Sequence, residues 1–446
     1  MSSAETLPEE SKTESRLLDS QGEKSLAAYF SDWFERIRAG DLGILPTLLG
    51  LFMIAIIFQS LNNLFITPYN IVNLLPQMAG LTAIAFGAVF VLLLGEIDLS
   101  VGYVSGVSAA IMVILSIPKS GVEIPAFLVN IENIPLLYDA GIYLFNAYVA
   151  GFPWYIALAA GLLTGILIGL LHGTIITSFQ LPAFVVTLAG FLFWNGVLLI
   201  ILGNGGTVRI QDAVLRSFTR SYVPPTLSYV ITLIVITIWA LIQFRKRYVR
   251  QKKGLSTDPR AILFLQLGLI VIIAIGIVYY LNLDRGIPVV AVFVLFLFAI
   301  LTYIVDSTRY GRYLMAVGGN KEAARRAGIP VELIRTSVFM ISGLMAAIGG
   351  IILSLRLGSA STSFDAGSLL LNAIAAAVIG GTSLFGGRGF VYSALLGALI
   401  IQGVDNGMGL LGLSSGVKFI VTGLVLLSAV VLDSFSRRRQ QQSGIA

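Results

Sequence analysis

Apolar runs of about 20 residues, long enough to cross a bilayer as helices, repeat along the chain from residue 44 to residue 433. Short polar or basic segments separate them, and helices satisfy every backbone polar group within the membrane. The pattern therefore predicts an all-α polytopic membrane protein. We expect about twelve transmembrane helices, or about ten to twelve if some segments are re-entrant, at residues 44–61, 72–94, 102–117, 152–177, 183–203, 227–244, 261–281, 287–305, 337–355, 370–386, 390–411 and 416–433.

Two of these spans are less regular than the others. Residues 102–117 are short for a full crossing, and 370–386 could instead form a re-entrant hairpin. Two long outer segments, 118–151 and 204–226, contain Pro, Asn and aromatic residues. We expect them to form packed caps, which could receive a partner or act as a simple lid.

Composition supports the membrane assignment and excludes several kinds of chemistry. Only 12% of the residues are charged, against about 25% in typical soluble proteins. The chain has no cysteine and one histidine, His172, which excludes disulfides and a multi-histidine metal site. No G-x-x-x-x-G-K-S/T phosphate-binding loop occurs. We therefore expect no catalytic residues, metal or cofactor in this chain, and any ATP that drives it must be bound by another chain.

The basic residues predict the orientation. Residues 245–260 contain seven Lys and Arg residues and one acidic residue, Asp258. Because positively charged loops stay on the cytoplasmic side, this segment places both termini in the cytoplasm and leaves only seven of the 29 Lys and Arg residues outside. We expect a partly disordered cytosolic tail at 1–43, a transmembrane domain at 44–433 with a cytosolic loop near 306–336, and a cytosolic tail at 434–446.

Part of this loop, residues 318–330, carries the signals of a short capped helix. Asn320 is a favourable N-cap, Gly328 is a favourable C-terminal stop, and Pro330 prevents continuation. Small side chains spaced to share one face would let another surface approach closely, and three alanines have this spacing: Ala323, Ala324 and Ala327. The pattern predicts a docking helix for a partner protein.

Residues 95–102 (Gly-Glu-Ile-Asp-Leu-Ser-Val-Gly) place two carboxylates in a long stretch that is otherwise uncharged. One interpretation is a tight turn at the cytosolic surface, with Glu96 in solvent. The other is a broken helix whose free backbone groups and Asp98 line an aqueous path. Since the i, i+2 spacing points the two carboxylates to different sides of a helix, a catalytic pair is not expected. The sequence leaves both interpretations open.

Glycines recur at every fourth position of the expected fourth span, where they form a ridge for close helix contact within one chain or across a dimer: Gly161, Gly165, Gly169 and Gly173. His172, beside the last glycine, is expected to be a packing histidine with satisfied hydrogen bonds, and a proton relay is the alternative. The Gly-rich segment 379–389 lacks the lysine of a phosphate-binding loop. It is interpreted as a sharp inner turn or the tip of a re-entrant helix.

Asp405 and Asn406 lie near the outer end of the eleventh expected span. A carboxylate inside the membrane is costly unless it is paired, and Lys418 is the nearest cation across the short outer hairpin. Structural pairing and a role in a substrate path both remain open for Asp405. Six polar residues are candidates for such a path: Glu96, Asp98, Ser100, Asn372, Asp405 and Asn406.

Four ordered stretches together resemble the membrane-spanning permease of bacterial monosaccharide ABC importers, the ribose, xylose, arabinose and galactose group. They are the Gly-Gly-Asn…Glu-Ala-Ala…Gly-Ile loop at 318–329, the 95–102 segment, residues 375–389 and residues 405–408. The likeness extends from about residue 45 to residue 433. Four further features resemble the xylose-type branch: Glu96, residues 186–190, residues 284–288 and an additional helix pair around 227–281.

The resemblance implies a permease subunit, not an enzyme, that imports a monosaccharide, with xylose as the expected cargo. Ribose, galactose, arabinose or a nucleoside are alternatives in the same importer class, and an ion-coupled secondary transporter is the rival class. The resemblance further implies a homodimer in the bacterial cytoplasmic membrane, an ATP-binding partner that holds ATP and Mg, an external sugar-binding protein and no nucleic acid. The residues expected to contact the ATPase are Asn320, Glu322, Ala323, Ala324, Arg325 and Gly328.

Two positions depart from the pattern of the family. Asn372 stands where the family often has Asp, and Thr422 stands where it often has Lys. Because an acid and a base are both replaced by neutral residues, we hypothesise that the two positions contact one another. Lys418 lies one helical turn before Thr422 and could stand in for the missing base.

Overall fold

The computed structural model describes residues 44–118, 148–203, 206–255, 259–362 and 365–424, with a few isolated positions besides. Apart from such positions, the expected tails and most of the outer segment 118–151 lie outside the described residues. The chain divides into two compact units. Residues 44–222 and 288–431 form the larger unit, and the smaller unit contains residues 223–287.

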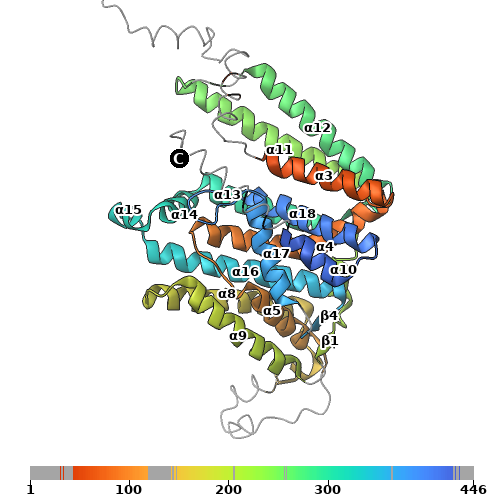
Figure 1. Ribbon diagram of the computed structural model, residues 1–446, viewed down its shortest axis with the longest axis vertical. Helices are drawn as coiled ribbons and strands as arrows, with labels where there is room; N and C mark the ends of the chain where they lie inside the picture. The colour runs from red at the N-terminus through yellow and green to blue at the C-terminus, as the bar shows by residue number, and fades with distance from the viewer. Residues whose placement is uncertain are drawn as a thin grey trace, which may run out of the picture. The chain divides into compact units, whose positions relative to one another are not determined.

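Nearly all of the regular structure is helical (Figure 1). In the described part of the chain, seven helices are long and apolar enough to cross a membrane: α4 (Pro68–Leu93), α8 (Trp154–Ser178), α9 (Ala183–Leu202), α11 (Pro225–Lys252), α12 (Arg260–Asn282), α13 (Val289–Ser307) and α16 (Val331–Leu357). Four shorter apolar helices are α3 (Leu45–Leu61), α5 (Val101–Ser116), α17 (Ala366–Ile379) and Ser415–Leu424. With α18 (Val391–Leu410), they confirm the prediction of an all-α polytopic membrane protein.

Each expected span overlaps one of these helices, because a long apolar run is a local property of the sequence. The largest difference is at 370–386, where α17 ends at Ile379 and residues 380–390 turn without forming a helix. α5 has 16 residues and α17 has 14. These lengths correspond to about 24 and about 21 Å of helix, against about 30 Å for the hydrocarbon core. The number of crossings therefore stays a prediction.

α4 and α16 form the core of the larger unit. Nearly all of α4 and most of α16 are buried, and α16 packs against α4, α5 and α8 (Figure 1). Glycines allow the close approach: a side chain at Gly80 of α4 would meet the backbone of Gly349 in α16, and the converse also holds. Because lipid tails are as apolar as the helices, the hydrophobic effect does not drive helices together inside the membrane. Tight packing is therefore an important source of their association.

The glycine ridge of α8 lies against helices of the same chain. Its four glycines face, in chain order, the backbone or side-chain atoms of Ser108, Gly343, Phe339 and Thr336. The first of these partners belongs to α5 and the other three belong to α16. The packing interpretation of the ridge is confirmed, and the contact lies within one chain.

A small sheet lies where α16 ends. β4 (Ser359–Ser361) pairs antiparallel with β1 (Thr207–Arg209). α10 (Ala213–Phe218) follows β1 and begins after Asp212, whose carboxylate accepts a hydrogen bond from the backbone N of Leu215 at 2.9 Å. The described part of the outer segment 204–226 is thus a packed cap, as predicted. The sheet itself was not predicted, because strands of three residues are too short to show a periodic pattern.

The smaller unit contains the helix pair α11 and α12. Asn282 Nδ2 donates a hydrogen bond to Ser228 Oγ at 3.0 Å, and the rings of Phe244 and Phe264 lie 6.2 Å apart. Two short strands, β2 (Tyr222–Val223) and β3 (Ile287–Pro288), pair with each other. Most apolar side chains of α11 and α12 are exposed within the chain, as in helices that face lipid.

The glycine ridge generates a stability prediction. Gly169→Ala would drive a Cβ atom into the backbone of Phe339, so we expect a lower midpoint of thermal unfolding in detergent. Gly196→Ala in α9 is the matched control, because no atom of the described part of the chain lies within 4 Å of its added Cβ. There the gain in helix propensity should be neutral or stabilising by about 0.5–1 kcal/mol. An equal rise for both variants would contradict the close contact between α8 and α16.

Candidate coupling site and the buried polar network beside it

The predicted docking helix is present as α15 (Lys321–Arg326), between α14 (Arg309–Gly319) and α16. Asn320 caps it, because its side-chain oxygen accepts a hydrogen bond from the backbone N of Ala323 at 2.9 Å. Beyond its other end, Gly328 has a φ of +80°, which favours glycine, and Ile329 N donates to Ala324 O at 3.1 Å. Both predicted capping signals are confirmed.

The three alanines of this segment do not form one exposed face. Ala324 is 4% exposed and lies in the hydrophobic core, whereas Ala323 and Ala327 are exposed. A helix at the end of a bundle must turn one side inward, and successive residues lie about 100° apart around its axis. The prediction of a shared docking face is therefore wrong. Ala324 packs α15 onto the bundle, while its neighbours remain open to a partner.

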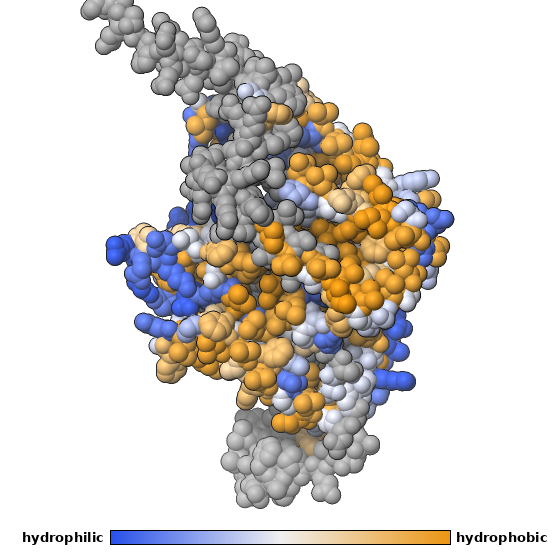
Figure 2. Space-filling view, in the orientation of Figure 1, coloured by the Kyte–Doolittle hydropathy of each residue, from blue (hydrophilic) through white to orange (hydrophobic). Residues whose placement is uncertain are grey.

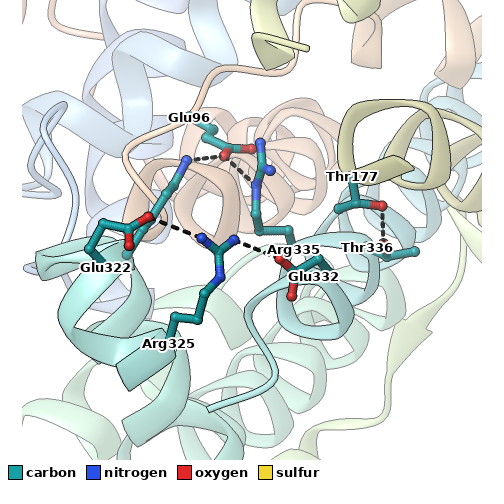
Figure 3. A network of polar contacts seen from close by, with 8 residues as sticks. Glu96, Thr177, Glu322, Arg325, Glu332, Arg335 and Thr336 are labelled. Carbon is teal, nitrogen blue, oxygen red and sulfur yellow. Dashed lines mark hydrogen bonds and ion pairs between the residues drawn. The ribbon is translucent and has the colours of Figure 1, made fainter. Parts of the chain in front are cut away.

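Charged side chains cover the outer side of α14 and α15. Figure 2 shows a hydrophilic surface on the side where Figure 1 places the two helices. Arg325 pairs with Glu322 at 3.0 Å and with Glu332 of α16 at 2.7 Å (Figure 3). More than half of each side chain is exposed, so these ion pairs add little to stability. They leave Glu322 and Arg325 accessible at the surface.

Glu96 lies beneath this helix and is not in solvent. Its side chain is 6% exposed, and Oε1 accepts hydrogen bonds from Lys321 Nζ at 2.6 Å and Arg335 Nε at 2.7 Å (Figure 3). Lys321 begins α15, and Arg335 lies near the start of α16. A buried carboxylate without a partner would be strongly unfavourable, so the two cations explain how this one is tolerated. The interpretation that places Glu96 in solvent is therefore wrong.

Three segments that are distant in sequence meet beside Glu96 through their backbones. We call this contact the glycine junction, and its members are Gly95, Gly318, Gly386 and Gly387. Gly387 N donates a hydrogen bond to Leu93 O at 2.9 Å. A side chain at Gly318 would meet Leu93 O, and one at Gly386 would meet Gly318 O. The ends of α4 and α14 thus contact the turn after α17, and this turn is compatible with both interpretations of residues 379–389.

Asp98 and Ser100 belong to a second polar network, which is buried. Asp98 accepts hydrogen bonds from the backbone N of Ser100 at 3.0 Å, the Ser100 hydroxyl at 2.6 Å and the Ser342 hydroxyl at 2.8 Å. Ser100 Oγ lies 3.2 Å from His172 Nδ1, and Trp194 Nε1 donates to His172 Nε2 at 3.1 Å. Residues from the α4–α5 connection, α8, α9 and α16 therefore share one chain of hydrogen bonds.

The donors of this network determine the state of His172. An indole N–H can only donate, so Nε2 of His172 is an acceptor and Nδ1 carries the proton that it donates to Ser100. Both ring nitrogens are satisfied, which confirms the prediction of a packing histidine. The helix is broken between Leu93 and Val101, as one interpretation of this segment expects. Because Asp98 and Ser100 are buried, their role in an aqueous path stays a prediction.

Asp405 pairs with Lys418, as one of the two interpretations of this residue expects, with 3.4 Å between Oδ1 and Nζ. Gln402 also donates a hydrogen bond to Asp405, at 3.2 Å. Asn406 exchanges two hydrogen bonds with Asn70 of α4, at 2.8 and 3.2 Å. These contacts tie α18 to α4 and to the following helix, and they leave half of the Asp405 side chain exposed.

The hypothesis that Asn372 and Thr422 contact one another is not supported by any hydrogen bond in the described part of the chain. Among the described residues, no hydrogen bond joins Asn372 to Thr422, and Lys418 is paired with Asp405. Asn372 is partly buried in α17. Its role in a substrate path stays a prediction.

Sequence reasoning missed most partners of the site residues. In the sequence, Lys321 and Arg335 are two of several basic residues in the loop near 306–336, and Trp194 and Ser342 carry no signal of their own. One signal could have found the first two: an acid inside an apolar stretch needs a cation, and the loop near 306–336 is rich in them. The hydroxyl donors could not be chosen, because many other Ser and Thr residues occur in the spans.

A family model described as the permease component of a branched-chain amino acid transport system matches residues 70–430. The xylose transport system permease protein XylH of Escherichia coli (strain K12) is 34% identical over 419 residues, which cover 94% of this chain and 98% of that protein. The ribose import permease protein RbsC of Bacillus subtilis (strain 168) is 33% identical over 395 residues, which cover 88% and 94%. No solved structure matches the chain.

The fold and these similarities define a multi-pass permease of the cytoplasmic membrane. The chain belongs to the family of transport-system permease components, among which its similarity to sugar permeases extends over nearly its whole length.

The buried network generates a second prediction. Asp98→Ala removes the acceptor of three hydrogen bonds, so the buried hydroxyls of Ser100 and Ser342 lose the group to which they donate. We expect a loss of stability of about 2 kcal/mol or more, measured as a lower midpoint of thermal unfolding. Asp405→Ala is the matched control, because that carboxylate is half exposed and its ion pair is long; its cost should stay below about 1 kcal/mol. Equal losses would contradict the central role of Asp98.

Proposed function

We propose that the chain is the membrane-spanning permease subunit of an ATP-binding cassette importer for a monosaccharide, with xylose as the leading cargo. The observation that carries this proposal is the 34% identity to XylH over 94% of the chain. The capped helix α15 adds a structural reason, since an importer without its own nucleotide-binding loop needs a surface that contacts an ATPase. Xylose is proposed as the cargo because XylH is named as a xylose permease.

Ribose is the second candidate cargo, because RbsC of Bacillus subtilis is 33% identical over 88% of the chain. Galactose, arabinose and nucleosides remain alternatives without a specific observation in their favour. The contacts of the acidic residues disfavour an ion-coupled secondary transporter. Glu96 is held by two cations, Asp98 by three hydrogen-bond donors and Asp405 by Lys418. Each of these carboxylates is thus occupied by partners of the same chain.

The proposed assembly has two copies of this chain, an ATP-binding subunit that holds ATP and Mg, and an external sugar-binding protein. Each copy crosses the membrane about twelve times with both termini in the cytoplasm. Glu322, Ala323 and Arg325 form the exposed contact with the ATPase, while Asn320 and Gly328 shape the helix that presents them. Asn372, Asp405 and Asn406 remain the candidates for the sugar path.

In this proposal, ATP-driven closure of the ATPase favours one of two states of the membrane helices. An ATPase can shift such an equilibrium only by binding the two states with different affinity. α15 is the element through which this difference acts, because it combines exposed charges with a buried residue, Ala324, that packs into the helix bundle.

The direct test is uptake of labelled xylose into proteoliposomes that contain this chain, its ATPase and its sugar-binding protein. We expect uptake that requires ATP and that unlabelled xylose inhibits more strongly than ribose, galactose, arabinose or nucleosides. If ribose inhibited uptake more strongly than xylose, ribose would become the proposed cargo and the importer class would stand. Uptake driven by an ion gradient without the ATPase would overturn the proposed function.

A charge reversal in the same assay tests the docking helix. Glu322→Lys should lower ATP-dependent uptake about tenfold, equivalent to about 1.4 kcal/mol, because it changes the charge of the exposed contact surface. Asp284→Lys is the control, since it breaks an ion pair of the same length with Arg285 outside α15. A normal rate for Glu322→Lys, or an equal loss in both variants, would contradict docking through α15.

A further inference from the structure

Two contacts of different character hold α15 to the rest of the larger unit at the Glu96 end. The glycine junction joins the end of α14 to α4 and to the 385–387 turn through close contacts between backbone atoms. The second contact is the ion pair between Glu96 and Lys321, the first residue of α15 (Figure 3). A backbone contact has no side chain that can rearrange, whereas an ion pair can open and close.

The two cations on Glu96 are not equivalent. The side chain of Lys321 is 42% exposed and that of Arg335 is 13% exposed. Lys321 can therefore exchange the carboxylate for water at lower cost than Arg335 can, because more of its side chain already lies at the surface. Arg335 would lose a buried charge partner if its bond broke, which costs far more. Movement of α15 would thus separate Lys321 from Glu96 first.

The carboxylate of Glu96 has capacity for a second arrangement. Both cations approach Oε1, while Oε2 is buried and has no hydrogen-bond partner among the described residues. A guanidinium group can bind both oxygens of a carboxylate at once. If Lys321 leaves, a rotation of either side chain would let Arg335 engage Oε2 as well as Oε1. The site therefore has two arrangements in which the buried charge stays neutralised.

The chain connects this site to the buried network. Residues 96–100 are not helical and lead from Glu96 directly to Asp98 and Ser100. Asp98 binds Ser342 of α16, and Ser100 contacts His172 of α8, which binds Trp194 of α9. A shift of Glu96 would move Asp98, which follows it by two residues. It would therefore displace Ser100 and Ser342, because short hydrogen bonds connect both serines to the carboxylate of Asp98.

We propose that Glu96 is a positioning residue that transmits the movement of α15 to the transmembrane helices. In one state Glu96 binds both Lys321 and Arg335, and in the other it binds Arg335 alone. The inference rests on the proposed function, in which α15 contacts the ATPase. The glycine junction is the fixed pivot of this movement, and the Lys321 ion pair is the contact that opens. Three helices in contact with the Asp98 network, α8, α9 and α16, receive the displacement.

The test uses the complete importer in proteoliposomes and measures ATP hydrolysis and sugar uptake together. Lys321→Gln is chosen because Lys321 is half exposed, so the variant should fold, whereas a change at Glu96 would leave Arg335 buried without its partner. We expect Lys321→Gln to hydrolyse ATP but to import about fivefold less sugar per ATP. Lys321→Arg should restore the ratio, because it restores a cation for Glu96.

Arg312→Gln, which removes an exposed cation from α14, is the matched control and should leave the ratio unchanged. An unchanged ratio in Lys321→Gln would overturn the role of Glu96 while the importer remains established by the wild type. An equal loss of hydrolysis and uptake, or the same loss in Arg312→Gln, would also overturn it. If the wild type shows no ATP-dependent uptake, the proposed function fails, and the role of Glu96 fails with it.

Discussion

The need to neutralise a buried carboxylate shapes the part of this protein that surrounds α15. Glu96 lies at the end of the almost fully buried helix α4, where an unpaired charge would be intolerable. Its partners come from residues more than 200 positions later in the chain. The requirement therefore fixes where α15 begins and where α16 enters the bundle. Asp98, two residues further on, meets the same requirement with hydroxyl and backbone donors instead of cations.

Glycine supplies the second constraint on the same region. At the glycine junction and along α8, the chain approaches itself so closely that a side chain has no room. These backbone contacts make the bundle rigid where α14 meets α4. The ion pairs of Glu96 are contacts in this region that can change without displacing a backbone. The division between rigid and exchangeable contacts is what makes the region around α15 suitable for transmitting a movement.

The sequence predicts the parts of this structure that depend on neighbouring residues. Apolar runs located the helices, and Asn320 and Gly328 located the ends of α15, because both signals are local. It could not predict that Glu96 is buried, since Lys321 and Arg335 are brought to it only by the packing of α4, α14 and α16. The prediction of a shared alanine face was wrong for the same reason. Tertiary contacts decide which side of α15 faces the bundle, and Ala324 lies on that side.

The central claim is that α15 contacts the ATPase, and the absence of cysteine from the chain allows a direct measurement of that contact. Ala323→Cys introduces a single thiol on the exposed side of α15, and Ser217→Cys introduces one on the exposed side of α10, beside the cap where α16 ends. A short thiol-reactive cross-linker is applied to each variant in the assembled importer. The account predicts that Ala323→Cys cross-links to the ATPase and Ser217→Cys does not. Cross-linking from Ser217→Cys in place of Ala323→Cys would contradict it.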